Sequence, residues 1–336
     1  MIYRPLAGIV RTVYSCFFIM EISYDTFRSL YNGGFRMNDK CGLLILLRLY
    51  GNLSPSLLFK WWKEDPSLSL TEEKSHPLKK LSSKSIDVGA IRKLAEKELP
   101  NVKRIIASYR ENGISVIAIS SPEYPPLLKT IHDPPPVLFL KGNKTLLYEK
   151  RLIGIVGTRN PSAYGENAAS YFARALSKKE WTIVSGLAKG IDGHAHRETI
   201  RSKGRTIGVI AGGFNCIYPR ENRLLAQQMA ESHLLVSEHL PDAKPQKWHF
   251  PLRNRLISGL TEGVVVIQGK EKSGSLITAY QALEQGREVF AVPGSIFDEN
   301  SKGPAGLIQE GAKLVASVDD ILGELSGFQA RYTESV

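Results

Sequence analysis

The segment WHFPLRNRLISGL, residues 248–260, gathers aromatic and basic side chains within one short stretch of chain. Two aromatic residues, including Phe250, stand close to Arg253 and Arg255, and Lys247 lies just upstream. Aromatic rings can stack on bases while cations hold the phosphates, which is the combination that sequence-tolerant binding of a single strand requires. The segment therefore predicts contact with nucleic acid, and we expect it to form a long loop ahead of a strand.

A structural role is the alternative for the same residues. Phe250 and Leu252 would then pack in the core, and the arginines would pair with acids such as Glu238. Only Glu238 and Asp242 lie nearby, against five basic or histidine residues. Because so few acids are available, the binding interpretation is favoured over the structural one.

Two loops rich in small residues have the composition of phosphate-binding loops. SGLAKGIDG (185–193) leads from an expected strand into an expected helix, and free backbone N–H groups together with the helix dipole would form a cradle for phosphate. KSGSLITAY (272–280) is built in the same way, with two serines near the start of a helix. Arg159, after the first strand, can bring a forked guanidinium to the same edge. The residues that we assign to the two loops are Ser185, Gly186, Lys189, Gly190, Lys270, Ser273, Gly274, Ser275 and Thr278.

Three other kinds of site are excluded by residue spacing. GIVGTRNPSAYG lacks the glycine spacing of a dinucleotide-binding turn, and no acid ends the second strand. A Walker-type phosphate loop needs four residues between its first glycine and Gly-Lys, but five separate Gly263 from Gly269. His194 and His196 are two residues apart on an expected helix and point in different directions. Asp192 and His196 share a face, as a capping acid and a hydrogen-bonded histidine would. We therefore expect no metal, no cofactor and no catalytic residue.

These segments follow apolar runs that predict a parallel sheet. Five runs, each followed by Gly, Ser or Pro and then by a helix-length stretch, lie between Leu152 and Gly294. Runs that are apolar along their whole length are typical of strands buried on both faces. Ligands bind such sheets outside the carboxyl ends of the strands, which is where the loops described above lie. The runs are LIGIVG (152–157), WTIVSG (181–186), TIGVIAGG (206–213), VVVIQG (264–269) and VFAVPG (289–294).

The overall composition indicates a soluble protein with an anionic partner. The chain has 336 residues, of which 43% are hydrophobic, and this length suggests two domains. Lys and Arg number 44 against 33 Asp and Glu, a formal net charge of +11, and nucleic acid is the commonest anionic partner. The three cysteines form no close pair, which fits a reducing compartment. No apolar run approaches the ~20 residues that span a bilayer, so we expect a cytoplasmic protein without a membrane partner.

The first third of the chain reads as an extension followed by helices. Residues 1–36 show no clear periodicity, and we expect an upstream extension that precedes a biological start at Met37. Residues 37–110 predict a small helical domain, with Trp61 and Trp62 as core candidates. Its helices are expected in LLILLRLYG, SPSLLFKWWKE, IDVGAIRKLAEKEL and VKRIIASYREN, with breaks at Gly and Pro.

The remainder divides into a connector, an α/β domain and a tail. Residues 111–149 contain two short strands and many prolines, which is typical of a stiff connector. Residues 150–324 hold the five apolar runs and form the α/β domain. Residues 325–336 are expected to be a frayed polar tail.

An apolar flank is expected near the end of the α/β domain, in residues 303–322. Leu307 and Ile308 fall on a short helix, and Leu314 and Val315 fall on a strand at the sheet edge. We expect no further layer of the same chain to cover that edge, and a second copy related by a two-fold axis is the simplest partner. We therefore expect a homodimer through Leu307, Ile308 and Leu314. The alternative is that these residues pack only against the sheet.

Taken together, these segments resemble the DNA-processing protein A family (DprA, also called Smf) over roughly residues 105–324. The matching stretches are VGTRNPSAYG, IVSGLAKGIDGHAHRETI, TIGVIAGGFNCIYPREN, LLVSEH, FPLRNRLISGL, SGSLITAYQALEQGREVFAVPG and GLIQEGAKLV, in the same order and spacing. The resemblance implies an extended Rossmann-like domain behind a small helical domain of the sterile-alpha-motif kind. It also implies a homodimer that binds single-stranded DNA without sequence preference. Such proteins protect incoming DNA in natural transformation and help to load the recombinase RecA past single-strand-binding protein.

The resemblance further implies which residues bind the strand and where this chain departs from the family. The strand-binding residues would be Arg159, the two small-residue loops, and Phe250, Arg253, Asn254 and Arg255 of FPLRNR. Gln268 and Gly269 stand where the family has an acidic residue and alanine, and we expect no winged-helix domain of the kind that some relatives carry. Related phosphoribohydrolases share this sheet, but their catalytic loop PGGxGTxxE corresponds to SGSLITAY, which has no acid. We therefore expect a binding protein rather than an enzyme, and a nucleotide-binding or nucleotide-hydrolysing enzyme is the alternative.

Overall fold

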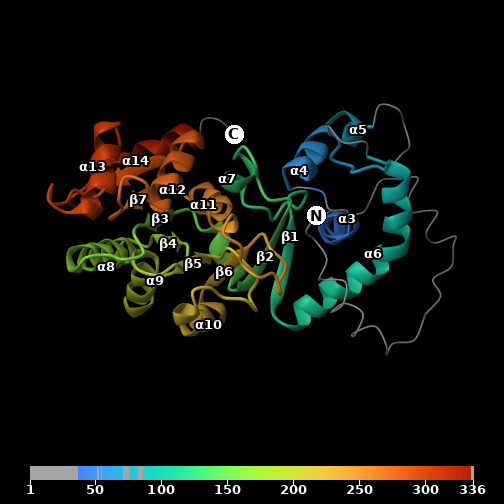
Figure 1. The fold of residues 1–336 in the computed structure, drawn as a ribbon, viewed down its shortest axis with the longest axis horizontal. Helices are drawn as coiled ribbons and strands as arrows, with labels where there is room; N and C mark the ends of the chain where they lie inside the picture. The colour runs from blue at the N-terminus through green and yellow to red at the C-terminus, as the bar shows by residue number, and fades with distance from the viewer. Residues whose placement is uncertain (1–36, 51–52, 54, 71–75, 82–85, 334–336) are drawn as a thin grey trace.

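One mixed sheet organises the molecule. The computed structural model describes residues 37–50, 53, 55–70, 76–81 and 86–333 (Figure 1), so the expected extension at 1–36 lies outside the described residues. Among these residues, nine strands form a single sheet. In spatial order they are β1 (Ile114–Ala118), β2 (Val137–Gly142), β6 (Leu234–Ser237), β5 (Thr206–Val209), β4 (Thr182–Ser185), β3 (Leu152–Val156), β7 (Gly263–Val266), β8 (Glu288–Ala291) and β9 (Lys313–Leu314).

Most of the sheet is parallel, as the apolar runs predicted. Strands β3 to β9 pair in parallel, whereas β1 and β2 add an antiparallel edge through the β2–β6 pairing. The five predicted runs are confirmed as β3, β4, β5, β7 and β8. The prediction missed β6, because this strand follows the helix α10 (Arg223–Ser232) after the single residue His233, without a Gly or Pro break.

Helices cover both faces of the sheet, which explains why its strands are apolar throughout. Side chains alternate along β3: Leu152 and Val156 join one buried cluster, and Ile153 and Ile155 join the other. The first cluster includes residues of α10, α11 (His249–Gly259), α12 (Gly274–Glu284) and α13 (Lys302–Gln309). The second includes residues of α8 (Ala163–Lys178), α9 (Ile191–Arg201) and α14 (Val318–Thr333). The fold is therefore the Rossmann-like α/β class that the sequence predicted.

A helical segment precedes the sheet and packs on its antiparallel edge. It comprises α3 (Met37–Leu49), α4 (Pro55–Glu64), α5 (Pro77–Leu81) and α6 (Val88–Glu111), which lie at one end of the molecule (Figure 1). Trp61 is fully buried, as predicted. The two helices expected on either side of Pro100 are one helix, α6, which changes direction along its length (Figure 1). Proline inside a helix removes one hydrogen bond and bends the helix without necessarily ending it.

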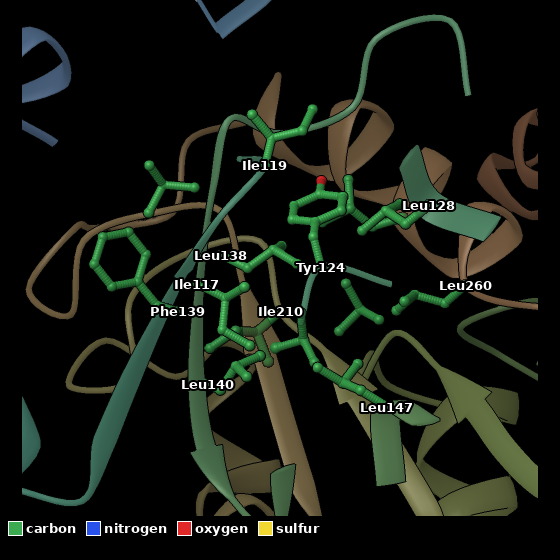
Figure 2. Close-up of a cluster of buried hydrophobic side chains, with 14 of the residues drawn as sticks. Ile117, Ile119, Tyr124, Leu128, Leu138, Phe139, Leu140, Leu147, Ile210 and Leu260 are labelled. Atoms are coloured by element: carbon green, nitrogen blue, oxygen red, sulfur yellow. The ribbon is translucent and has the colours of Figure 1, made fainter. Parts of the chain in front are cut away.

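The proline-rich segment 111–149 is part of the sheet as well as a connection. It contains β1, α7 (Pro126–Lys129), β2 and the 3-10 helix η1 (Lys144–Tyr148). Tyr124 lies among aliphatic side chains such as Leu128 and Leu138 (Figure 2), and its hydroxyl donates to the carbonyl of Pro135 over 2.7 Å. At the other end of the chain, the backbone of the expected polar tail is helical as far as Thr333, in α14. Another 3-10 helix, η2 (Arg220–Asn222), precedes α10, and η3 (Glu299–Ser301) precedes α13.

Candidate nucleic-acid interface

The loops that follow the parallel strands lie together, because the carboxyl ends of parallel strands point the same way. We call this carboxyl-end side of the sheet the rim. It consists of residues 157–162 after β3, 186–190 after β4, 210–222 after β5, 238–248 after β6, 267–273 after β7 and 292–301 after β8. Most of the predicted binding residues belong to these loops or to the helices that start there.

An aromatic cluster with a cation occupies the rim. The guanidinium of Arg159 lies over the ring of Phe250, 5.3 Å from its centroid. Phe250 is half-buried and meets Tyr218 edge to face, with centroids 5.7 Å apart. Tyr218 and Trp248 are 56% and 55% exposed. Aromatic faces open to solvent beside an arginine match the chemistry of base stacking and phosphate contact. We call Arg159, Tyr218, Trp248 and Phe250 the aromatic cluster.

The segment that carries Phe250 is helical, so the prediction of a long loop was wrong. Helix α11 begins at His249, whose ring stacks on His239 with centroids 4.0 Å apart. All residues from Arg253 to Gly259 are buried. A helix that is buried on all sides lacks the amphipathic period by which helices are predicted, and here the buried positions even include arginine.

Arg253 lies inside the molecule and not on its surface. Its side chain is 4% exposed and donates to the carbonyl oxygens of Gly186 and Val209, with its Nε 3.2 Å from Oδ1 of Asn254. Burial lowers the pKa of Arg253 to about 10, and the nearby carboxylate of Asp192 opposes that fall. The expectation of a solvent-facing arginine at this position is therefore wrong, because the carbonyl ends of β4 and β5 capture its donors.

Asp192 fills the cradle that the sequence assigned to phosphate. Its Oδ2 accepts from the backbone N–H of Gly186 at 3.1 Å and from that of Ala188 at 3.4 Å. Burial raises the pKa of the Asp192 carboxyl, and Arg253 opposes that rise. The N–H groups expected to be free at Gly186 and Ala188 are thus occupied by an internal carboxylate, so the cradle prediction was wrong for them.

The remainder of this loop is held by its neighbours, and only Lys189 is exposed. Ser185 is buried and donates to the carbonyl of Ile155 over 2.6 Å. Gly190 has φ +76°, and a side-chain carbon there would lie 2.4 Å from the carbonyl oxygen of Thr158. The loop after β4 therefore packs directly against the loop after β3, which brings Lys189 to the same edge as Arg159.

Arg255 and Asn254 hold α11 in place. Arg255 is buried and pairs with Oε2 of Glu238 at 2.6 Å, with Asp133 at 3.8 Å on its other side. The structural alternative stated for the arginines is therefore the one observed for Arg255. Asn254 is also buried, and its amide donates to the carbonyl of Gly274 over 3.2 Å, which ties α11 to the start of α12.

In the second small-residue loop, the cations face solvent and the hydroxyls face inward. Ser273 is the N-cap of α12, as predicted, and its Oγ lies 2.7 Å from Oγ of Ser275. Ser275 and Thr278 are buried. Among residues 270–275, Lys270, Glu271, Lys272 and Gly274 are exposed. Lys247, ahead of α11, is exposed as well.

Gln268 joins three rim loops where relatives were expected to carry an acid. Its Oε1 accepts from the backbone N–H of Ser162 at 3.1 Å. Its amide nitrogen donates to Oγ of Ser162 and to Oδ2 of Asp298, both at 2.9 Å. A neutral amide can accept and donate at once, which a carboxylate cannot do, so Gln268 suits this structural position.

The histidines of α9 are engaged separately. Nδ1 of His196 lies 2.7 Å from Oγ1 of Thr206, and Nε2 of His194 lies 3.3 Å from Glu166. Burial lowers the pKa of His196 to about 3, so this ring is neutral at physiological pH. His196 is therefore hydrogen-bonded, as expected. Asp192 does not cap α9, because its carboxylate accepts from the preceding loop and the N-cap residue is Gly190. Among the described residues, no group of three or more His, Cys, Asp or Glu side chains is arranged to hold a metal.

The residues predicted for self-association differ in exposure. Leu307 is buried in the first core cluster, so it cannot form part of a surface, and that assignment was wrong. Ile308 is partly buried against the same cluster. Leu314 is 45% exposed and lies on β9, the edge strand of the sheet. No helix within the described ranges is long and apolar enough to cross a membrane.

The sequence interpretation missed Tyr218. This residue lies in the stretch NCIYPREN after β5, in a rim loop far from α11 in sequence. Its distance from the predicted aromatic segment hid its contact with Phe250. The available signal was an aromatic residue in a loop at the carboxyl end of a predicted strand, where ligands bind.

Comparisons with known proteins agree with the fold. Residues 115–326 match the family model of DNA recombination-mediator protein A. DNA processing protein DprA of Bacillus subtilis (strain 168) is 58% identical over 298 residues, which cover 89% of this chain and 99% of the relative. The X-ray structure of DNA processing protein A from Streptococcus pneumoniae superposes with a TM-score of 0.75 at 36% identity, covering 84% of this chain and 97% of that one. The structure of DNA processing protein A from Helicobacter pylori, solved to describe its single-stranded DNA binding mode, has a TM-score of 0.58 at 29% identity and covers 64% of this chain and 96% of its own.

Proposed function

The chain belongs to the DNA recombination-mediator protein A family, and from this premise we propose that it binds single-stranded DNA along the rim. The observation that carries the proposal is the aromatic cluster, in which Arg159 covers Phe250 beside the exposed rings of Tyr218 and Trp248. Rings exposed at this edge can stack on bases only where the bases are unpaired, because a duplex hides their faces. When the bases stack on these rings, the phosphates of the strand face solvent, where nearby cations can contact them.

The exposed cations of the rim supply the phosphate contacts in this proposal. We assign this role to five of them, from loops that the fold brings to the carboxyl ends of the strands: Arg159, Lys189, Lys247, Lys270 and Lys272. Arg253, Asn254 and Arg255 act differently, as buried residues that position α11 and hence Phe250. Ser185, Gly186, Gly190, Ser273, Gly274, Ser275 and Thr278 shape the loops that carry the lysines.

The biological role follows from the family. A recombination mediator must hold single-stranded DNA for a recombinase, so we assign to this protein the loading of RecA onto strands covered by single-strand-binding protein, in the cytoplasm and during natural transformation. A homodimer would set two rims on one strand and raise the affinity for long DNA through effective concentration. Leu314 on the edge strand β9 and Ile308 on α13 are the proposed contacts between the two copies.

Binding without catalysis is the mode of action that the rim supports best. The alternative, a nucleotide-hydrolysing enzyme in the same crevice, needs a carboxylate open to the substrate. Asp192 is the carboxylate of the first small-residue loop, but it is buried and accepts backbone N–H groups. The first turn of α12 contains no acid, and Gln268 is an amide. These features favour a DNA-binding protein over a hydrolase.

Two substitutions separate the two kinds of contact in the proposed site. Phe250→Ala should weaken binding to single-stranded DNA by about 1–3 kcal/mol, the worth of one stacked base, and leave the salt dependence unchanged. Arg159→Ala should weaken binding and also reduce the log–log salt slope by about 0.7, because one phosphate contact is lost. The measurement is fluorescence anisotropy of a labelled oligonucleotide over a salt series.

A matched control lies at the amino ends of the parallel strands, opposite the rim. Arg151 is an exposed arginine just before β3, whereas Arg159 lies just after it. Arg151→Ala should therefore leave both the affinity and the salt slope at the parental values. If Phe250→Ala binds like the parent while circular dichroism shows an intact fold, Phe250 is a core residue and the proposed site is wrong.

A further inference from the structure

A turn after β8 presents two large apolar side chains to solvent. The N–H of Asp298 donates to the carbonyl of Ser295 over 3.0 Å, which closes a β-turn with Ile296 and Phe297 at its centre. Ile296 is 82% exposed and Phe297 is 91% exposed. Central turn positions usually hold Gly, Pro, Asn, Asp or Ser, each of which eases the turn. An exposed isoleucine and phenylalanine bring no such benefit, so their presence calls for a contact outside this chain.

The turn is held in a fixed position. The N–H of Gly269 donates to the carbonyl of Asn300 over 2.7 Å, and the N–H of Gly303 donates back to the carbonyl of Gly269 over 2.8 Å. The amide of Gln268 binds the carboxylate of Asp298 at 2.9 Å. These bonds clamp the C-terminal side of the turn to the loop after β7. Phe297 is therefore held outward by an anchored loop.

The turn adjoins the aromatic cluster along the rim. The amide nitrogen of Asn300 donates to the carbonyl of Asn160 over 3.4 Å, and Asn160 is next to Arg159, which covers Phe250. Phe297 precedes Asn300 by three residues, a chain length of at most about 10 Å. A single strand that contacts Phe250 and Arg159 thus needs only a few more nucleotides to reach Phe297, within the about 4–16 nucleotides that single-strand-binding folds cover.

The charges around the turn favour an anionic strand as its occupant. The two acids of the turn are engaged internally: Asp298 by Gln268 and by the N–H of Asn300 at 2.9 Å, and Glu299 by Lys302 at 2.6 Å. The loop that clamps the turn carries Lys270, Glu271 and Lys272, which are all exposed, so its net charge is positive. No ion pair of Lys270 or Lys272 is seen among the described residues. An aromatic ring beside free lysines repeats the chemistry of the aromatic cluster.

We propose that Phe297 is a second base-stacking residue, which extends the single-strand path from the aromatic cluster across the carboxyl ends of β3, β7 and β8. The inference rests on the proposed function, because it needs a strand already bound at Phe250 and Arg159. The ring of Phe297 stacks on a base several nucleotides from the one at Phe250. Lys270 and Lys272 hold phosphates between the two bases.

An oligonucleotide length series tests this assignment. Affinities for oligothymidylates of about 4 to about 16 nucleotides are measured by anisotropy for the parent, Phe250→Ala and Phe297→Ala. Phe250→Ala should weaken binding at every length. Phe297→Ala should leave the shortest strands unaffected and weaken the longest by about 5- to 150-fold, the worth of one stacked base. Its salt slope should equal that of the parent, and so should its mass by light scattering.

Two conservative variants and one control define the chemistry. Phe297→Trp should keep the parental affinity for long strands, and Phe297→Leu should lose it as Phe297→Ala does, because leucine is apolar but has no ring face. Tyr148, 46% exposed at the opposite edge of the sheet, is the matched control, and Tyr148→Ala should bind every length like the parent.

The outcomes distinguish this inference from the proposed function. If Phe250→Ala weakens binding but Phe297→Ala matches the parent at every length, the inference is overturned, and the turn is left to contact a protein. Parental affinity in Phe297→Leu also overturns it, because the contact is then apolar and not a stack. If neither substitution changes binding at any length, the proposed function itself fails.

Discussion

Arg253→Ala should destabilise the fold and not act as the loss of a DNA contact. The guanidinium is buried beside Asp192 and donates to the carbonyls of Gly186 and Val209. Removing it leaves a buried carboxylate without its cation and two carbonyls without their donor. Leaving a buried charge without a compensating opposite charge costs about 3–5 kcal/mol. That is a large part of the free energy of unfolding of a typical protein, which is roughly 5–15 kcal/mol.

Urea unfolding measures this loss directly. With a denaturant dependence of about 3 kcal/mol per molar urea, the midpoint of unfolding should fall by about 1 M or more. The double variant Asp192→Asn, Arg253→Met removes both charges and should recover part of the loss, because no uncompensated charge then stays buried. Arg159→Ala, an exposed position, should change the free energy of unfolding by no more than about 0.5 kcal/mol.

A specific result would refute this reasoning about Arg253. If Arg253→Ala keeps the parental unfolding midpoint while its salt slope on single-stranded DNA falls by about 0.7, the arginine is a phosphate ligand. The buried position would then not be the one that the protein adopts when it binds DNA. The sequence-based assignment of Arg253 to the binding surface would be restored.

Two further predictions concern acid stability and assembly. Because burial lowers the folded-state pKa of His196 to about 3, the unfolded state binds an extra proton there between pH 3 and about 6.5. His196 should therefore lower the free energy of unfolding by about 1.4 kcal/mol per pH unit as the pH drops through that window, and His239, whose pKa is also lowered to about 3, should add to the fall. His196→Gln should make the urea-midpoint profile less steep there, and a parental profile in that variant would contradict the assignment. Leu314→Glu should give a folded monomer by light scattering that binds long oligonucleotides more weakly than the parent, whereas Leu224→Glu, on the exposed side of α10, should stay dimeric; a parent that is already monomeric, or a dimeric Leu314→Glu, would place the interface elsewhere.

The strands of the sheet could be predicted because each one is encoded by a few consecutive residues. Each of the five runs is apolar at every position, and that alone distinguishes a strand buried on both faces. Ligands bind parallel sheets outside the carboxyl ends of the strands, so the position of the rim follows from the strands alone. Arg159 and Lys189 could be assigned to that edge because they follow strands directly, and the structure places both in exposed positions there.

The interior of the site could not be predicted, because its partners are far apart in sequence. Nothing near Arg253 indicates that its donors meet Gly186, which lies 67 positions earlier, or that Asp192 supplies its counter-charge. The same distance hid the contact between Tyr218 and Phe250. Helix α11 was not predicted, because its polar and apolar residues from Arg253 to Gly259 are all buried and show no amphipathic period. The phosphate cradle was predicted wrongly, because the carboxylate of Asp192 already accepts the N–H of Gly186.

A preference for unpaired bases is the most direct consequence of a rim that holds single-stranded DNA. A labelled oligonucleotide and its blunt duplex are compared by anisotropy over a salt series with the parent protein. The aromatic cluster predicts tighter binding to the single strand, with a log–log salt slope of roughly −0.7 for each phosphate contacted. Equal affinity for the duplex, or an affinity that does not change with salt, would contradict the proposal that rings and cations on the rim hold a single strand.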